Sequence, residues 1–302
     1  MNFNDRQLNK SLQDLIAQLR LPETFQPIVE QIYLPLSEIL NNHVNQASGT
    51  TFISINGCQG SGKTTLTIFL KTILEKAFGK SAAIISLDDF YLKKNERITL
   101  SKKVHPLFVT RGVPGTHDLE LMTDTIGQLL EASPVMLPVF DKLMDDRLEK
   151  KHWHNQAPAE VVLFEGWCNN SPAQDESALI NPVNELERNE DQSAKWRTYA
   201  NDMLKKYNQN FFNDADIKLM LLAPGFENVF QWRKNQEQKL ALDNKESNKK
   251  IMNSAELQRF IQHYERITRH SIEHMPEQVA DIVIPINDAQ QLTEIKVRNG
   301  FG

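Results

Sequence analysis

The segment GCQGSGKT at residues 57–64 constrains this chain more than any other feature. It satisfies the pattern G-x-x-x-x-G-K-[ST] in full, and the apolar, β-branched run TFISIN at 51–56 stands directly before it. Apolar residues at helical spacing follow over 63–77. Glycines at 57, 60 and 62 let the backbone turn tightly and direct successive N–H groups inward, at the positive end of the following helix. A strand, loop and helix of this kind bind phosphate.

We expect this loop to bind the phosphates of a nucleotide, with ATP favoured. Lys63 is expected to reach the β- and γ-phosphates, and Thr64 to ligate the Mg²⁺ ion that bridges them. The alternative is a chance glycine turn with a solvated lysine, which the flanking strand and helix disfavour. The expected nucleotide-binding residues are Gly57, Cys58, Gln59, Gly60, Ser61, Gly62, Lys63, Thr64 and Thr65.

The composition limits the partners of the chain. Its 302 residues carry a formal net charge of −5, so no overall positive field attracts nucleic acid or an anionic membrane. We find no apolar run long enough to span a bilayer, and the N-terminus lacks the apolar core of a signal peptide. Two cysteines form no disulfide framework and fit a reducing compartment. We therefore expect a cytoplasmic location and neither a nucleic-acid nor a membrane partner.

Apolar strands alternate with helical segments along most of the chain. Further strands are expected at 82–87, 160–166, 217–224 and 281–286, and further helices at 118–131, 194–212, 226–241 and 254–273. This alternation indicates an α/β fold in which helices cover both faces of a mostly parallel sheet. Ligands of such sheets bind at the carboxyl ends of the strands.

The beginning of the chain has a different pattern. Residues 5–45 carry apolar positions at helical spacing, interrupted by Pro22 and Pro27, and predict two helices. We divide the chain into an N-terminal helical extension at 1–48 and one domain at 49–302. The acidic stretch 185–191 and the Lys/Asn/Glu-rich stretch 243–250 are expected to be solvated loops or helix ends.

Acidic residues stand at the ends of two expected strands. Asp88 and Asp89 end the strand at 82–87, where a carboxylate can accept the proton of an attacking hydroxyl. We expect Asp88 to be the base and Asp89 to hold Mg²⁺ through water, whereas the alternative for both is a helix cap or turn. Glu165 ends the most apolar strand and is expected to place Mg²⁺, its alternative being a solvated loop acid.

Several motifs carry a family resemblance. Asp88-Asp89-Phe90-Tyr91 and Phe164-Glu165-Gly166 look like the Asp-Ser-Phe-Tyr and Phe-Glu-Gly of uridine kinases. The stretches Arg111-Gly-Val-Pro-Gly-Thr-His-Asp118, Leu137-Pro-Val-Phe-Asp141-Lys and Asp146-Arg147 look most like the D-glycerate 3-kinase family. The chain thus resembles the phosphoribulokinase, uridine kinase and pantothenate kinase branch of P-loop kinases, from about residue 30 to its end.

The resemblance implies a three-layer α/β/α P-loop fold with a helical lid over 226–250 and Asp88 as the catalytic base. It also implies substrate-binding roles for Asp89, Tyr91, Arg111, His117, Asp118, Asp141 and Arg147. Arg111 and Arg147 would clamp a carboxylate, while Asp118 would either bind a hydroxyl or cap the helix that starts there. Arg233 on the lid helix would act in catalysis by stabilising the transferring phosphoryl group, its alternative being a solvated side chain.

The resemblance implies transfer of the γ-phosphate of ATP to a small acceptor, and D-glycerate is the favoured candidate. The alternatives are a pantothenate, uridine or sugar kinase of the same branch, or a non-catalytic ATP-binding module. Residues 168–215 form a helical insertion relative to shorter uridine kinases, which either narrows the substrate site or makes an oligomer contact. The sequence leaves the oligomeric state, monomer or homodimer, open.

Overall fold

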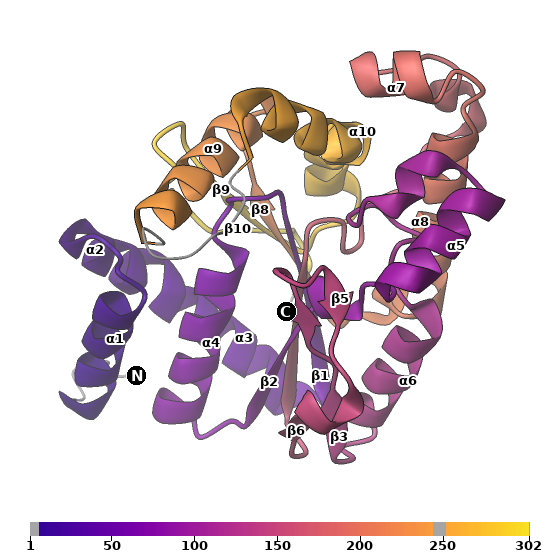
Figure 1. Cartoon of the computed structure of the whole chain (residues 1–302). Helices are drawn as coiled ribbons and strands as arrows, with labels where there is room; N and C mark the ends of the chain where they lie inside the picture. Colours follow the sequence, from indigo (N-terminus) through magenta and orange to yellow (C-terminus); the bar gives the residue numbers. More distant parts are fainter. Residues whose placement is uncertain (1–5, 244–251, 302) are drawn as a thin grey trace.

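A six-stranded sheet organises the computed structural model, which describes residues 6–243 and 252–301 (Figure 1). The strands follow the order β10-β9-β8-β1-β7-β2. β10 runs antiparallel to β9, and the other neighbouring pairs are parallel, as the alternation of strands and helices predicts. The bounds are Thr51–Gly57 (β1), Ala82–Ser86 (β2), Val161–Gly166 (β7), Ile217–Leu222 (β8), Ile282–Pro285 (β9) and Lys296–Val297 (β10).

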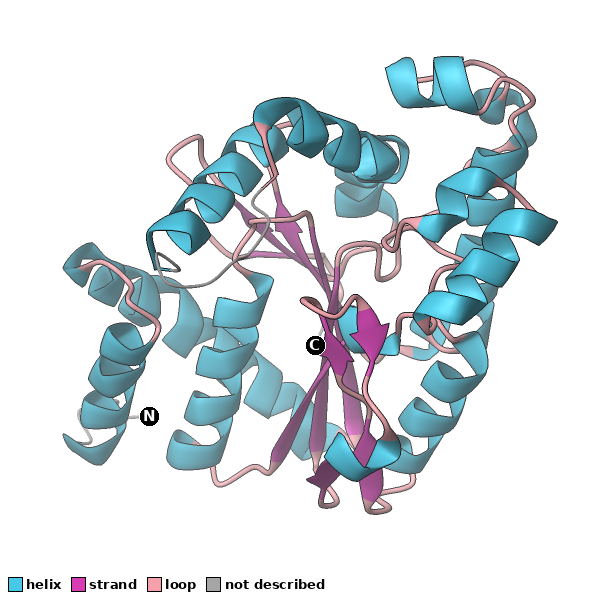
Figure 2. Ribbon diagram, viewed as in Figure 1, coloured by secondary structure: helices cyan, strands magenta, loops and turns pink. Residues whose placement is uncertain are grey.

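β1 lies at the centre of the sheet and is buried along its whole length. Successive side chains of a strand point to opposite faces. Accordingly, Ile53 and Ile55 belong to one hydrophobic cluster and Phe52 to another. Both faces of the sheet therefore need a cover, and Figure 2 shows helices on its two sides.

The N-terminal helices and α4 (Lys63–Ala77) cover one face (Figure 1). The first helix is α1 (Arg6–Gln18), and the second runs without a break through α2 (Gln26–Ile28), the π-helical turn η2 (Val29–Tyr33) and α3 (Leu34–Gln46). Pro27 lies in the first turn of α2, where its missing N–H costs no intrahelical hydrogen bond. Leu8, Leu12 and Leu40 pack in the same cluster as Phe69 of α4, so these helices share the core of the sheet.

The other face is covered by α6 (Leu119–Leu130) and α8 (Lys195–Asn210), whose side chains pack with Phe52 and Phe164. Beside them lie α5 (Lys94–Lys103) and two small antiparallel pairs. β3 (Val135–Leu137) pairs with β6 (His154–Gln156), and β4 (Phe140–Asp141) pairs with β5 (Asp146–Arg147). Short 3-10 turns span Glu23–Phe25, Leu87–Phe90, Pro106–Val109, Lys150–His152, Glu176–Leu179 and Phe212–Asp214.

The acidic stretch 185–191 forms a helix with buried carboxylates. In α7 (Glu185–Glu190), Glu187 is 1% exposed and accepts hydrogen bonds of 2.8 and 2.6 Å from Arg266. Asp191 follows the helix and pairs with Arg197 of α8 at 2.9 Å. The expectation of a solvated segment is wrong for these two acids, because Arg266, 79 residues from Glu187, and Arg197, six residues from Asp191, neutralise them.

The expected lid region contains α9 (Phe226–Asp243), and α10 (Ser254–Gln278) follows it. The part of this region at 244–250, with most of the Lys/Asn/Glu-rich stretch, lies outside the described residues. Figure 1 shows α9 and α10 together over one end of the sheet. None of the helices within the described ranges has the length and apolar composition that crossing a bilayer requires.

The buried ion pairs of α7 can be tested by substitution. We expect Glu187→Ala to lower the free energy of unfolding by about 3–5 kcal/mol, because Arg266 would be left buried without its carboxylate. Glu185→Ala is the control, since its pair with Arg188 is exposed and contributes about 1 kcal/mol or less. Urea unfolding measures both values, and equal losses would contradict the role of the buried pair.

Candidate functional site

The phosphate-binding loop follows β1 and leads into α4 in the way that its sequence predicts. Gly60 and Gly62 adopt φ angles of 80° and 89°, the left-handed region that other residues avoid. A Cβ atom at Gly57 would lie 2.6 Å from the hydroxyl oxygen of Ser61. The Lys63 ammonium donates a hydrogen bond of 3.1 Å to the carbonyl of Cys58. The loop thus has the backbone shape and the cation that a phosphate group needs at the start of a helix.

Glu165 connects the loop to the neighbouring strands. Its carboxylate accepts hydrogen bonds from Thr64 at 3.1 Å and from Ser86 at 3.0 Å. The side chain is 8% exposed. The alternative of a solvated loop acid does not describe this residue, because its contacts are to α4 and β2 rather than to open solvent.

Asp88 and Asp89 lie in the 3-10 turn that ends β2. Neither carboxylate caps that turn. Asp88 pairs with Lys142 at 2.6 Å and accepts a hydrogen bond of 3.1 Å from the Tyr91 hydroxyl. Burial alone would raise the pKa of Asp88, but the ammonium groups of Lys142 and Lys63 outweigh it and lower that pKa below its usual value. Asp88 is therefore a charged carboxylate within the electrostatic reach of Lys63 in the phosphate loop.

Asp89 completes a group of three acidic side chains. One of its oxygens accepts a hydrogen bond of 3.2 Å from the backbone of Phe140. Burial raises the pKa of Asp89 to about 6, and the charges of Asp88 and Glu165 act in the same direction. Such mutual repulsion is relieved by positive charge near the carboxylates.

These oxygen donors fit Mg²⁺ in chemistry. Thr64, Asp89 and Glu165 offer one hydroxyl and two carboxylates, and Mg²⁺ prefers oxygen ligands while retaining waters and substrate phosphates. Within 6–243 and 252–301, no group of three or more His, Cys, Asp and Glu side chains could hold a metal ion by itself. Thr64, Asp89 and Glu165 would therefore hold the ion together with nucleotide phosphates.

The segment 111–118 packs against the residues that follow Asp88 and Asp89. The buried ring of His117 stacks on Tyr91 at 4.5 Å, and its Nδ1 atom lies 3.1 Å from the Tyr207 hydroxyl. Burial lowers the pKa of His117 to about 3, against the opposing effect of the Asp88 charge. A neutral histidine of this kind positions Tyr91 and does not compete with Asp88 for a proton.

The two arginines expected to clamp a substrate carboxylate already contact carboxylates of the chain. Arg147 pairs with Asp118 at 2.9 Å, and the other oxygen of Asp118 caps α6. Arg111 pairs with Asp145 and lies over the ring of Phe140. The carboxylate of Asp141 accepts backbone hydrogen bonds within its own turn. Binding of substrate by these residues stays a prediction.

The α9 helix reaches the phosphate loop through Trp232. A Cβ atom at Gly60 would lie 2.9 Å from the Cβ of Trp232, and Gln290 donates a hydrogen bond to the Gly60 carbonyl. The Arg233 guanidinium lies 6.0 Å from the centre of the Phe260 ring. Its contact with a transferring phosphoryl group stays a prediction.

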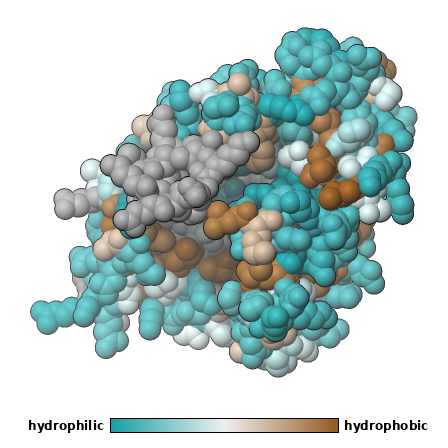
Figure 3. Space-filling view, viewed as in Figure 1, coloured by the Kyte–Doolittle hydropathy of each residue, from teal (hydrophilic) through white to brown (hydrophobic). Residues whose placement is uncertain are grey.

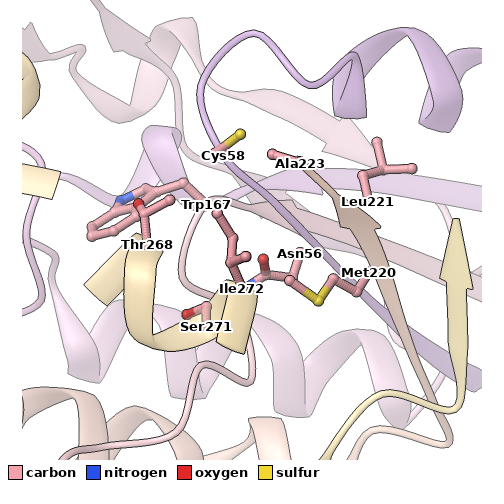
Figure 4. Close-up of a pocket in the computed structure, with 9 residues that line it drawn as sticks. All are labelled: Asn56, Cys58, Trp167, Met220, Leu221, Ala223, Thr268, Ser271 and Ile272. Atoms are coloured by element: carbon pink, nitrogen blue, oxygen red, sulfur yellow. The ribbon is translucent and has the colours of Figure 1, made fainter. Parts of the chain in front are cut away.

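A small cavity lies behind the loop, between β1, β8 and α10 (Figure 4). Its volume of about 10 Å³ leaves room for roughly one water molecule. Asn56 lines it and donates to Ser171, which in turn accepts a hydrogen bond from Ser271 of α10. The cavity cannot take a nucleotide, so the open side of the phosphate loop is the candidate nucleotide site.

Sequence reasoning missed Lys142, Asp145 and Gln290. Their contacts with Asp88, Arg111 and Gly60 span separations in the chain of 54, 34 and 230 residues. The motif Asp141-Lys142 together with Asp146-Arg147 carried a signal for the first two, because both lie at the short turn that joins these charged segments. Nothing in the pattern around Gln290 indicated its contact.

Known proteins resemble this chain in sequence and in fold. No protein-family model matches the chain. The chain is 32% identical over 228 residues to the uncharacterized kinase mug58 of Schizosaccharomyces pombe, covering 72% of this chain and 79% of that protein. It is 36% identical over 126 residues to the chloroplastic D-glycerate 3-kinase of Arabidopsis thaliana, covering 38% of this chain and 27% of that protein.

The fold has a solved counterpart. D-glycerate 3-kinase from Cryptococcus neoformans superimposes with a TM-score of 0.75 at 22% identity, over 88% of this chain and 99% of that structure. Together with the phosphate loop and the acidic strand ends, the similarity to mug58 assigns the chain to a family. The chain belongs to the P-loop kinases related to mug58 and D-glycerate 3-kinase.

Proposed function

We propose that the protein transfers the γ-phosphate of ATP to a hydroxyl group of D-glycerate, giving 3-phosphoglycerate. The observation that carries this proposal is the position of Asp88. Its carboxylate stands at the end of β2, near enough to the phosphate loop for the charge of Lys63 to lower its pKa. A nucleotide-binding module without catalysis needs the loop but has no use for a charged base beside it.

The side chains divide the reaction between them. Asp88 accepts the proton of the acceptor hydroxyl as that oxygen attacks the γ-phosphorus, and the bond to the β–γ bridging oxygen breaks to release ADP. Lys63 stabilises the negative charge on the phosphates. Thr64, Glu165 and Asp89 would hold Mg²⁺, which would supply positive charge against the negative charge that develops on the phosphates.

The surroundings of Asp88 favour a small acceptor. Tyr207 of α8 accepts a hydrogen bond of 2.8 Å from the backbone of Gly115, and Tyr199 packs against the same glycine. The segment 168–215 is thus packed against the stretch 111–118. This packing supports a narrow acceptor site, which disfavours a nucleoside as the acceptor. The ammonium group of Lys142, which pairs with Asp88, supports an acid as the acceptor.

An acceptor screen tests the substrate. The whole chain with ATP and Mg²⁺ should release ADP with D-glycerate at least about tenfold faster, in kcat/KM, than with pantothenate, uridine or ribulose 5-phosphate. A coupled assay for ADP measures each rate. Preference for uridine or pantothenate would show a kinase of the same branch with a different acceptor. ADP release no faster than background would favour the non-catalytic alternative.

The base assignment has its own test. We expect Asp88→Asn to lower kcat by about 100-fold or more, because an amide cannot accept the proton, while ATP binding is retained. Asp202→Asn on α8 is the matched control, since its carboxylate is exposed and contacts Lys205. Turnover of the Asp88 variant within about threefold of the unaltered protein would exclude Asp88 as the base.

A further inference from the structure

Lys142 lies in the turn of the β4–β5 hairpin and pairs with the expected base. The distance between its ammonium and Asp88 is 2.6 Å, and the two side chains are 62% and 36% exposed. Exposed ion pairs contribute about 0–1 kcal/mol, so exchanging one carboxylate partner for another costs little. Lys142 is therefore held at Asp88 by an interaction that a ligand can replace.

The backbone of this turn is held from several sides. Asp89 accepts a hydrogen bond from the backbone of Phe140 before the turn, and Asp141 accepts two within it. After the turn, Asp146 accepts a hydrogen bond of 3.0 Å from the backbone of Lys94. These bonds fix where the Lys142 side chain begins, so that its exposed end can change partners while the hairpin stays in place.

The neighbouring arginines are engaged differently. The Arg147 side chain is 7% exposed and pairs with Asp118, whose other oxygen caps a helix. Arg111 is 26% exposed, pairs with Asp145 and lies over an aromatic ring. Of these three cations, Lys142 is the most exposed and is the one that pairs with Asp88.

The acceptor hydroxyl competes with Lys142 for Asp88. A base must approach that hydroxyl to about 2.6–3.2 Å, and one Asp88 oxygen already accepts from Lys142 at 2.6 Å while the other accepts from the Tyr91 hydroxyl at 3.1 Å. A neutral acceptor would displace the ammonium without offering it a new partner. An acceptor with a carboxylate next to its hydroxyl groups would offer one at the same place.

We propose that Lys142 determines acceptor specificity by leaving Asp88 and pairing with the carboxylate of the acceptor, so that the site selects hydroxy acids over neutral alcohols. The inference rests on the proposed kinase function but does not require the acid to be glycerate. In this inference Lys142 discriminates between charged and neutral acceptors, while Asp88 accepts the proton.

The test compares an acid with its amide. Values of kcat/KM are measured for D-glycerate and D-glyceramide with the unaltered protein and with Lys142→Met, Lys142→Arg and Lys151→Met. Lys151 is the matched control, because it is 69% exposed and pairs with Glu149. We expect Lys142→Met to lower kcat/KM for glycerate by about 10- to 100-fold, chiefly through KM, and for glyceramide by less than about threefold. Lys142→Arg should restore most of the preference for the acid, and Lys151→Met should change neither value.

The outcomes separate the two proposals. If Lys142→Met lowers kcat/KM equally for the acid and the amide, the inference is overturned. Lys142 would then support turnover without discriminating between charged and neutral acceptors. If the protein phosphorylates only neutral acceptors such as uridine, the inference is also overturned, although the protein would still be a kinase. Turnover of another hydroxy acid in place of glycerate would contradict only the glycerate assignment, and that acid and its amide would then be compared. Absence of ADP release with every acceptor would contradict both proposals.

Discussion

The two hydrogen bonds that Glu165 accepts from Thr64 and Ser86 join the first turn of α4 to the ends of two strands. They form because β1 and β2 both run parallel to β7 and in register with it, which places Ile55 and Ser86 level with Glu165. The phosphate loop and the acidic turn after β2 therefore open at the same edge of the sheet. Without that alignment, the loop would bind phosphate at a distance from any base.

The packing of the sheet maintains this alignment. β1 is buried along its length, and clusters of apolar side chains cover both of its faces. The surface seen in Figure 3 is mostly hydrophilic, with apolar side chains in a broken band across its middle. Among the exposed apolar residues are Leu143 and Met144, which follow Lys142 in the hairpin turn and are 71% and 66% exposed. The turn that reaches Asp88 is thus open to solvent on one side.

Local patterns predicted the frame of the molecule well. The apolar run before Gly57, the helical spacing after it and the strands ending near Asp88 and Glu165 each depend on neighbours in the chain, and the structure has them at those places. Contacts between distant segments could not be read in the same way. Glu187 looked solvated because Arg266 lies 79 residues away, and β4 and β5 are two-residue strands too short to give a periodic signal. The contact of Lys142 with Asp88 was missed because it too joins distant segments, 54 residues apart.

Nucleotide phosphates at the loop 57–64, beside the acidic strand ends, can be detected by titration calorimetry. A non-hydrolysable ATP analogue with Mg²⁺ is titrated into the whole chain. We expect saturable binding that Lys63→Ala weakens by about 100-fold or more, while Lys71→Ala, on the same helix and paired with Glu75, leaves it unchanged. Binding that is equally strong in the Lys63 variant, or is absent from the unaltered protein, would exclude this loop as the nucleotide site.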